Sequence, residues 1–299
     1  MESGGLTWEG FRPVMTKVSI RESEISSIAM LTQELYDRGF KELCLLQRTP
    51  EGKYYTRHEG RLYVYTPEIE GDKLRLRSVE SGTAFAGVLG RFHAVSEGYI
   101  QQPGAKLRVC WGKRVEKYRI LTSKLEKYSA RIKKTGCSCQ FESCTRENID
   151  ELLYRARASM KILKSTRYLM ALENSMRKRQ ICLNAISANT MRVTEGGPVI
   201  MNVFEMGYNM IEEDLGELIK KVTAQTGDKD AFRCIMEAYS QERGDMEYSE
   251  EIIRALAAFP CDSLRIISRY MRTGGEGDCP SDKYSKYAMR ELKCNVLEV

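Results

Sequence analysis

The sequence predicts an α+β protein of two lobes, in which a small lobe with an antiparallel sheet and one helix precedes a larger, mainly helical lobe. Three observations lead to this class. Short strand-like runs occupy residues 14–65, apolar residues recur at helical spacing through most of the remaining chain, and Pro67-Glu-Ile-Glu-Gly71 separates the two patterns. We therefore expect a first domain over residues 1–70, a hinge near 67–71, and a second domain over residues 71–299.

The first lobe begins with a predicted strand, because Val14, Thr16 and Val18 alternate with other residues as on a half-buried strand. A helix over residues 25–36 follows, and Gly39 is placed to end it. Three short apolar and aromatic runs separated by turn-forming residues then predict further antiparallel strands at 43–46, 53–56 and 61–65.

The second lobe shows helical periodicity almost throughout. A long helix is expected from about residue 149, with Thr145 as its N-cap, and its periodicity continues towards Met176. The predicted helices cover residues 85–95, 115–132, 149–176, 215–222, 232–239, 252–256, 264–270 and 281–292.

Composition is that of a globular protein, with 42% hydrophobic and 29% charged residues among 299. No apolar run approaches the length of about 18 residues that a membrane span requires, and the N-terminus does not resemble a signal peptide, so we expect synthesis in a cytosol. The net charge of +6 is small, and its densest basic runs, residues 131–134 and 177–179, are typical of solvated helix ends. We expect no nucleic-acid partner.

Ten cysteines are present, and three of them, Cys137, Cys139 and Cys144, lie within eight residues. A zinc site would need a fourth ligand, and neither of the two histidines is near in sequence. We expect a reduced, exposed loop, with metal binding or cross-linking between chains as alternatives.

The stretch from Cys182 to Asn189 has the spacing H-x-D-x-x-x-x-N of a phosphotransferase catalytic loop, and residues 190–202 form a predicted hairpin after it. Asn189 matches the pattern. Cys182 stands at the histidine position and Asn184 at the aspartate position, so the frame of the loop is kept and its acidic residue is not.

Several further segments follow a family pattern: Leu89-Gly-Arg-Phe-His-Ala-Val-Ser-Glu-Gly98, then Trp111-Gly-Lys113, and later Ala258-Phe-Pro260. In their order and separation they closely resemble the CotS-type spore-coat proteins of endospore-forming bacteria. That family belongs to the aminoglycoside phosphotransferase and choline kinase branch of the protein-kinase-like fold. The resemblance covers nearly the whole chain and implies a two-lobed kinase-like fold with a truncated first lobe.

The resemblance also assigns positions. The metal-binding aspartate of the family falls on Asn202, and its structural aspartate on Asp214. Lys17 is a candidate for the lysine that pairs with nucleotide phosphates, with Glu24 or Glu34 as its partner; a surface lysine is the alternative. Little chain precedes residue 14 to form a glycine-rich loop over a nucleotide.

These replacements bear on catalysis. An asparagine at 184 cannot usefully accept a proton, and general-base catalysis contributes about 10²–10⁴ in rate. An amide at 202 lacks the charge with which carboxylates hold Mg²⁺. We do not expect Glu195 or Glu205 to substitute, because a shift of three positions along a strand end turns a side chain to another face.

The sequence therefore leads us to expect a catalytically inactive pseudokinase, not an enzyme, without cofactor. The resemblance implies a structural or assembly role in the spore coat, with other coat proteins as partners, synthesis in the mother cell and deposition on the forespore. The alternatives are a small-molecule phosphotransferase that uses ATP and Mg²⁺, and a regulator that binds ATP without transferring phosphate.

Overall fold

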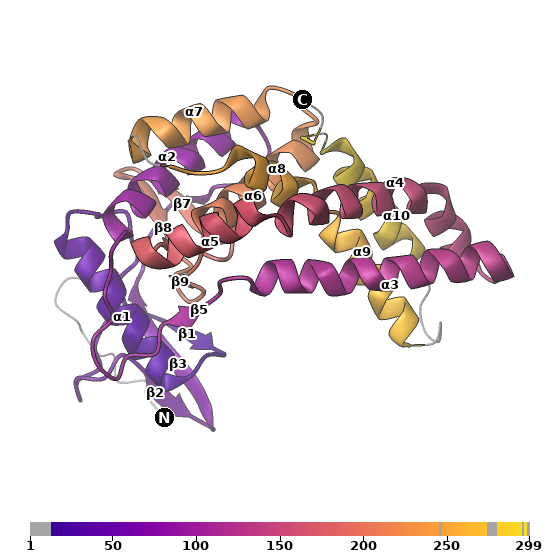
Figure 1. Cartoon of the computed structure of the whole chain (residues 1–299). Coiled ribbons are helices and arrows are strands. Elements are labelled where there is room, and N and C mark those ends of the chain that lie inside the picture. The colour runs from indigo at the N-terminus through magenta and orange to yellow at the C-terminus, as the bar shows by residue number, and fades with distance from the viewer. Residues whose placement is uncertain (1–12, 245–246, 274–279, 295, 298–299) are drawn as a thin grey trace.

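The computed structural model describes residues 13–244, 247–273, 280–294 and 296–297. Its first lobe consists of β1 (Pro13–Val18), α1 (Glu22–Asp37), β2 (Thr56–His58) and β3 (Arg61–Pro67). The three strands form an antiparallel sheet in the order β1-β3-β2, and α1 lies against it (Figure 1). The start of α1 is fixed by Glu24, whose carboxylate accepts a hydrogen bond from the backbone nitrogen of Arg21 at 3.0 Å.

Two strands predicted in this lobe differ from the structure. Residues 43–46 form no strand: Leu43 makes one isolated bridge to Ile200, and the neighbouring Gln47 makes another to Tyr65. The buried run packs across both lobes, so its backbone does not follow a single ladder. The strand predicted at 53–56 is displaced, because β2 begins only at Thr56.

Two small sheets lie in the second lobe. One contains β4 (Asp72–Lys73), β7 (Met191–Thr194) and β8 (Gly197–Ile200), and the other contains β5 (Arg108–Val109), β6 (Ile181–Cys182) and β9 (Gly207–Tyr208). The strands β5 and β9 approach so closely that a Cβ on Gly207 would lie 2.4 Å from the carbonyl oxygen of Arg108. A glycine is therefore required at this point beside the loop.

Helices make up the rest of the second lobe. Two of them, α3 and α4, run side by side and extend away from the first lobe, with α9 and α10 beside them (Figure 1). The helices are α2 (Val79–Ser96), α3 (Lys113–Thr135), α4 (Gln140–Leu163), α5 (Thr166–Lys178), α6 (Ile211–Thr226), α7 (Ala231–Arg243), α8 (Glu250–Ala258), α9 (Cys261–Arg272) and α10 (Ser281–Lys293). The predicted fold class, a small sheet-and-helix lobe with a mainly helical lobe, is confirmed.

The long helix predicted from residue 149 towards 176 is two helices. It begins earlier than expected, with Cys139 and not Thr145 as the N-cap residue of α4. It also ends at Leu163, and α5 starts at a new N-cap, Ser165, whose hydroxyl accepts a hydrogen bond from the backbone nitrogen of Tyr168 at 3.3 Å.

One hydrophobic core joins the two lobes. It includes Ile25 and Leu31 of α1, Phe85 and Phe92 of α2, and Leu218 of α6, all of which are fully buried. A second core fills the space between α3, α4, α8, α9 and α10. The domain boundary at 70/71 and the hinge at 67–71 stay predictions. Among the described residues, no helix has both the length and the hydrophobicity to cross a membrane.

Candidate functional site

The loop from residue 182 to 189 connects β6 to β7 and starts at the centre of the second lobe. Its first residue, Cys182, pairs with Gly207 of β9 in the sheet β5-β9-β6. The sheet places the beginning of α3, the loop and the segment before α6 side by side. The backbone nitrogen of Asn202 donates to the carbonyl oxygen of Thr190, just after the loop, at 3.4 Å, so the segments that hold Asn184 and Asn202 are neighbours.

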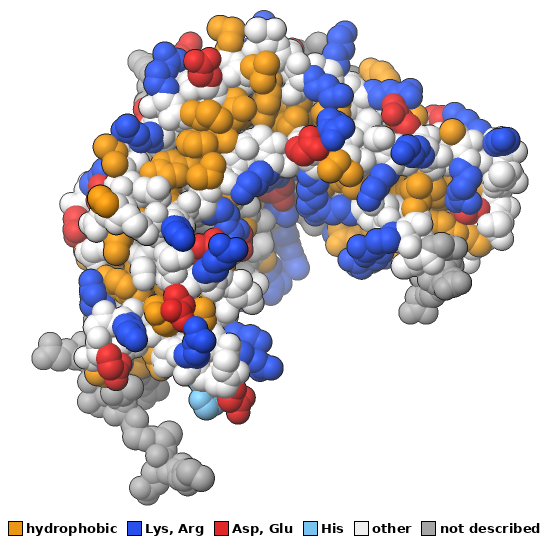
Figure 2. Space-filling model, turned by 60° about the horizontal axis from the view of Figure 1, so that its bottom comes forward, with side chains coloured by type: hydrophobic (Ala, Val, Ile, Leu, Met, Phe, Trp, Pro, Cys, Tyr) orange, Lys and Arg blue, Asp and Glu red, His pale blue; other side chains and the backbone are white. Residues whose placement is uncertain are grey.

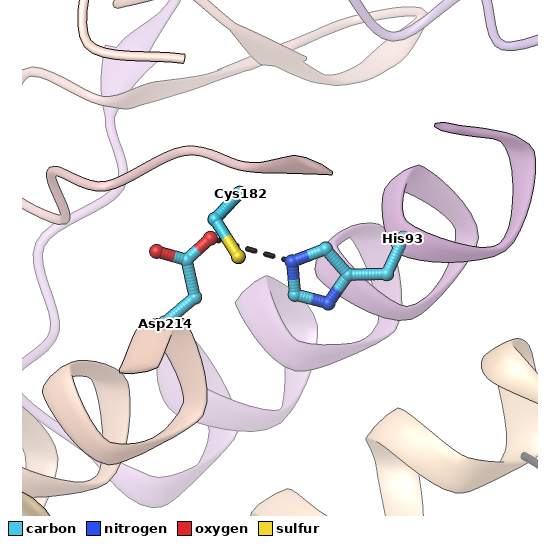
Figure 3. Close-up of side chains that lie close together, drawn as sticks. All are labelled: His93, Cys182 and Asp214. Atoms are coloured by element: carbon cyan, nitrogen blue, oxygen red, sulfur yellow. Dashed lines mark hydrogen bonds and ion pairs between the residues drawn. The ribbon is translucent and has the colours of Figure 1, made fainter. Parts of the chain in front are cut away.

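Asp214, in the first turn of α6, holds the start of the loop by hydrogen bonds to its backbone. Its carboxylate accepts hydrogen bonds from the backbone nitrogens of Leu183 at 2.6 Å and Asn184 at 3.0 Å. The same carboxylate lies 3.3 Å from Nε2 of His93 (Figure 3), and the other ring nitrogen, Nδ1, lies 3.0 Å from the hydroxyl of Tyr239. Asp214 and His93 are both 1% exposed, so these bonds form without competition from water. The frame of the loop is therefore held by a buried polar network.

Cys182 lies beside this network, with its sulfur close to His93 and Asp214 (Figure 3). Its thiol donates a hydrogen bond to the carbonyl oxygen of Met210 at 3.1 Å, and burial raises the pKa of the thiol well above its ordinary value. Of the described residues, these three alone bring His, Cys, Asp or Glu ligand atoms together within 4.8 Å as a group of three. Each of them already has a partner in the protein, which is typical of a structural core.

Asn184 is held by its neighbours on both ends of its amide. Its nitrogen donates to the carbonyl oxygen of Glu205 at 3.0 Å, and its oxygen accepts from Nδ2 of Asn209 at 2.7 Å. The residue has φ of 58°, a left-handed conformation that asparagine tolerates better than most residues. In this position an amide satisfies both neighbours, whereas a carboxylate would face the carbonyl oxygen.

We therefore expect Asn184→Asp to lower the free energy of unfolding by about 1 kcal/mol, because the partly buried carbonyl oxygen of Glu205 would lose its donor and face a carboxylate. Urea denaturation would measure it. Asn189→Asp is the matched control, because Asn189 lies on the same loop with an exposed side chain and should change stability by less than about 0.5 kcal/mol. Equal effects of the two substitutions would show that the contacts of Asn184 do not stabilise the loop.

A chain of polar groups continues from Asn184 into the pocket beside it. Nδ2 of Asn209 also donates to Glu213 at 2.9 Å, and Nε of Arg114 donates to the same carboxylate oxygen at 2.9 Å. Burial raises the pKa of Glu213, although Arg114 acts in the opposite direction. Burial also pushes the pKa of Glu217 upward, but Arg114 and the neighbouring lysines outweigh it and hold that pKa at about 2.

Sequence reasoning missed Arg114, Asn209 and Glu213 because they belong to no sequence motif. Two buried acceptors here, Oδ1 of Asn209 and Oε1 of Glu213, have no hydrogen-bond partner in the structure. Both residues line a pocket of about 430 Å³ together with Asn184. The signal that could have found Glu213 is its acidic neighbourhood at the first turn of a helix, Glu212-Glu213-Asp214.

The predicted metal position, Asn202, is partly buried, and its side-chain oxygen accepts a hydrogen bond from the backbone nitrogen of Phe204 at 3.4 Å. The side chain of Asn189 is exposed. The nearby carboxylate of Glu205 is paired with Arg108. A donor set of two neutral amides with a carboxylate already neutralised by arginine does not fit Mg²⁺, which prefers charged oxygen ligands.

Lys17 lies on an exposed part of β1, opposite Tyr63 of β3. Within the described chain it has no ion-pair partner. Both carboxylates predicted to pair with it have other contacts: Glu24 caps α1 and lies 3.9 Å from Arg108, and Glu34 pairs with Arg38. The assignment of Lys17 to a nucleotide stays a prediction.

Of the three clustered cysteines, Cys137 and Cys139 lie in the turn between α3 and α4, whereas Cys144 lies within α4, and all three are half-buried, so the predicted exposed loop is wrong in this respect. They are free thiols, and the group of potential metal ligands found among the described residues does not include them. Cys139 has its sulfur 3.3 Å from the hydroxyl of Tyr270. Burial raises the pKa of Cys139, but Tyr270 and the backbone amides of the first turn of α4 outweigh it, so the net pKa is lowered.

Titration of His93 provides a test of the buried network. Burial lowers the pKa of His93, so the ring stays neutral in the folded protein while the unfolded chain takes up a proton near pH 6.5. Stability should therefore fall as pH decreases below about 6.5, because the unfolded state binds more protons there. Between pH 7.5 and 5.5 we expect the wild type to lose more stability than His93→Gln, because only the wild type carries this buried ring.

Urea unfolding at the two pH values would measure this difference. The matched control is His58→Gln, since His58 is the other histidine of the chain and is exposed. The control should keep the pH dependence of the wild type. A His93→Gln protein with the same pH dependence as the wild type would contradict the account.

We compared the sequence and the structure with those of known proteins. No family model matches the sequence. The chain is 22% identical over 200 residues to spore coat protein S of Bacillus subtilis (strain 168), a match that covers 66% of this chain. The match covers 57% of that relative, so the chain spans little more than half of its length.

Solved structures share the fold over nearly the whole chain. An aminoglycoside phosphotransferase from Alicyclobacillus acidocaldarius subsp. acidocaldarius has a TM-score of 0.80 at 15% identity, covering 99% of this chain and 89% of its own. A microcompartment-associated aminopropanol kinase has a TM-score of 0.60 at 11% identity, covering 95% of this chain and 84% of its own. The predicted likeness to aminoglycoside phosphotransferases is confirmed as a likeness of fold.

The expectation that the chain is a pseudokinase and not an enzyme is wrong. The proteins that share its fold are, by name, phosphotransferases and kinases, and one of them, a spectinomycin phosphotransferase, holds ADP and spectinomycin. The expectation rested on two side chains, Asn184 and Asn202. Their replacement leaves the frame of the loop in place, because Asp214 holds that frame through backbone groups.

Proposed function

We propose that the protein is a component of the bacterial spore coat that carries a ligand-binding cleft of phosphotransferase architecture. The similarity to spore coat protein S over two thirds of the chain supports this proposal most directly. We further propose that it is made in the mother cell, assembles on the forespore and has other coat proteins as partners.

The cleft supports a binding role in addition to a structural one. Glu213 is 3% exposed and Asn209 1% exposed, and each keeps one acceptor oxygen without a partner. Buried polar groups without partners reduce stability by about 1–3 kcal/mol, so they are typical of sites that a ligand completes. A protein with a purely structural role would gain by replacing them with apolar residues.

Localisation in sporulating cells tests the coat role. A fluorescent fusion expressed in the source organism from the gene's own promoter should form a shell around the forespore and appear in the coat fraction of purified spores. The control is the same fluorescent protein expressed alone from that promoter, which should stay in the mother cell. A fusion of the full chain that stays in the mother cell, as the control does, would contradict the proposal.

A second candidate function is phosphoryl transfer to a small molecule, and Glu213 is the observation that favours it. It is a carboxylate of raised pKa with an unpartnered oxygen, and it lines the same pocket as Asn184. Such a group suits a general base, a role that contributes about 10²–10⁴ in rate.

Release of ADP from ATP by the purified protein, with and without small hydroxylated or aminated acceptors, tests this candidate. Acceptor-dependent release that falls about a hundredfold in Glu213→Gln, and not in the exposed control Glu237→Gln, would support it. Thermal unfolding of both variants separates a catalytic effect from loss of fold. No release under any condition would leave the binding role alone.

A further inference from the structure

Two adjoining pockets flank the loop that holds Asn184 and Asn189. One, of about 430 Å³, lies between the start of α3, the loop and α6, and the other, of about 730 Å³, lies between the loop, α6 and α10. They share Glu217, Lys220 and Asp262, so they form one groove. Figure 2 shows a hollow on this side of the molecule, with Lys and Arg side chains gathered along its inner edge.

Charge in this groove is far from balanced. Eleven Lys and Arg residues and five Asp and Glu residues line the two pockets. The excess of six positive charges equals the net charge of the whole chain, in which 47 Lys and Arg stand against 41 Asp and Glu. The remainder of the protein is therefore neutral, and the groove carries the whole excess.

Each of the five acidic residues that line the groove forms an ion pair with a lysine or arginine of the groove. The five acids pair with five of the lining cations, as in Arg114 with Glu213 and Glu217, Lys220 with Glu291, and Arg265 with Asp262. The other six cations have no ion-pair partner within the described chain. They are Lys73, Arg75, Arg77, Lys113, Lys117 and Arg290.

These six cations lie on both sides of the loop. Lys113 and Lys117 are one turn apart on α3, Lys73 and the two arginines lie on or just after β4, and Arg290 is on α10. Burial lowers the pKa of Lys117, and the nearby Arg265 and Arg114 lower it further. Like charges gathered in a concave site repel one another and attract anions more strongly than the same charges on a convex surface.

We propose that this groove binds a small molecule with two or more anionic groups, phosphates or carboxylates, that reaches across the loop between the two sets of unpaired cations. The proposal rests on the ligand-binding cleft proposed above and names its ligand class. It differs from what the names of the solved neighbours suggest for the molecules that accept the phosphoryl group in those proteins, since aminoglycosides and aminopropanol carry cationic amines, whereas the ADP held by the spectinomycin phosphotransferase is anionic.

Pocket size favours a small ligand over a macromolecule. Volumes of about 430 and 730 Å³ are in the usual range for small-molecule sites. Two aromatic residues line the groove, Tyr118 and Tyr287, and Tyr118 is buried, which leaves little surface for stacking nucleic-acid bases.

Isothermal titration of the purified full chain with tripolyphosphate and with citrate, at about 0.15 M salt, tests the inference. The two probes distinguish phosphate from carboxylate recognition, and spermidine serves as the cationic counterpart. We expect at least one anion to bind, spermidine not to bind, and Kd to rise about tenfold or more in Lys113→Ala/Lys117→Ala and in Arg75→Ala/Arg77→Ala.

The matched control is Lys127→Ala/Lys134→Ala, which removes two exposed charges from the same helix α3 outside the groove. It should bind like the wild type. Absence of binding by both anions, or an equal loss of affinity in the control, would overturn the inference. So would an oligonucleotide or a polyglutamate peptide that binds tenfold more tightly than either small anion.

Failure of this inference and failure of the coat role can be told apart. Titration uses purified protein and does not depend on where the protein resides, whereas localisation does not depend on the groove. The Lys113→Ala/Lys117→Ala fusion should therefore still reach the spore coat. Loss of anion binding overturns the ligand class alone, and a wild-type fusion that stays in the mother cell overturns the coat role alone.

Discussion

Replacement of Asp214 by alanine should lower the free energy of unfolding by about 3–5 kcal/mol, the largest loss that we expect from a single substitution near the loop. Asp214 is 1% exposed and accepts hydrogen bonds from two backbone nitrogens of the loop while contacting His93. Alanine would leave these backbone N–H groups and His93 without a hydrogen-bond partner, and water cannot take the place of the carboxylate because the groups are buried.

Equilibrium urea denaturation followed by circular dichroism would measure this loss. The control is Asp150→Ala, since Asp150 forms an exposed ion pair with Lys133 at 2.6 Å and should contribute less than about 1 kcal/mol. If Asp214→Ala were as stable as this control, the buried network could not be what holds the loop. Because the loop depends on Asp214, we also expect the substitution to weaken ligand binding in the groove.

A comparable loss, about 3–5 kcal/mol, is expected for Glu291→Ala at the end of the chain. Glu291 is 3% exposed, and its carboxylate accepts hydrogen bonds from Lys220 at 2.7 Å and from the backbone nitrogens of Asp262 at 2.8 Å and Ser263 at 3.0 Å. It therefore neutralises a buried lysine and caps the N-terminus of α9 at once. Alanine would leave Lys220 as a buried charge paired only weakly with Asp262 at 4.0 Å.

Thermal and urea unfolding of Glu291→Ala and Glu291→Gln would test both roles of this carboxylate. Glutamine can still accept hydrogen bonds from the backbone of α9 but cannot neutralise Lys220, so its stability should lie between alanine and the wild type. Glu237→Ala, which removes an exposed carboxylate paired with Arg233, serves as the control. A loss no greater than that of the control would mean that Lys220 does not need its partner.

Much of the fold could be predicted because the patterns that specify it are local. Periodic apolar residues located most helices, and the order of motifs from Leu89 to Pro260 indicated the kinase-like architecture. Errors arose where tertiary contacts compete with local preference. The break between α4 and α5 lies inside a continuous apolar pattern, and residues 43–46 read as a strand although Leu43 pairs only with Ile200 of the second lobe and the adjacent Gln47 pairs with Tyr65 of the first.

The site was predicted in outline and missed in detail for a physical reason. Loop spacing identified Asn184 and Asn189, because their separation along the chain is characteristic, and the family resemblance assigned Asn202 and Asp214. Arg114, Asn209 and Glu213 come from three separate segments, and only folding brings them into one hydrogen-bonded chain. The expectation of a non-enzyme was wrong because it considered only the replaced side chains, Asn184 and Asn202, and not the backbone of the loop, which Asp214 holds in place.

By itself, the sequence determined the fold class, the position of the loop and the size of the net charge, since each is a property of local pattern or composition. Only the tertiary structure decided where that charge lies. A charge of +6 spread along the chain looked unimportant, yet folding brings eleven cations and five acids together around one groove and leaves six of those cations unpaired. The interaction between two charges depends on the distance between them in space, and their separation along the sequence does not give that distance.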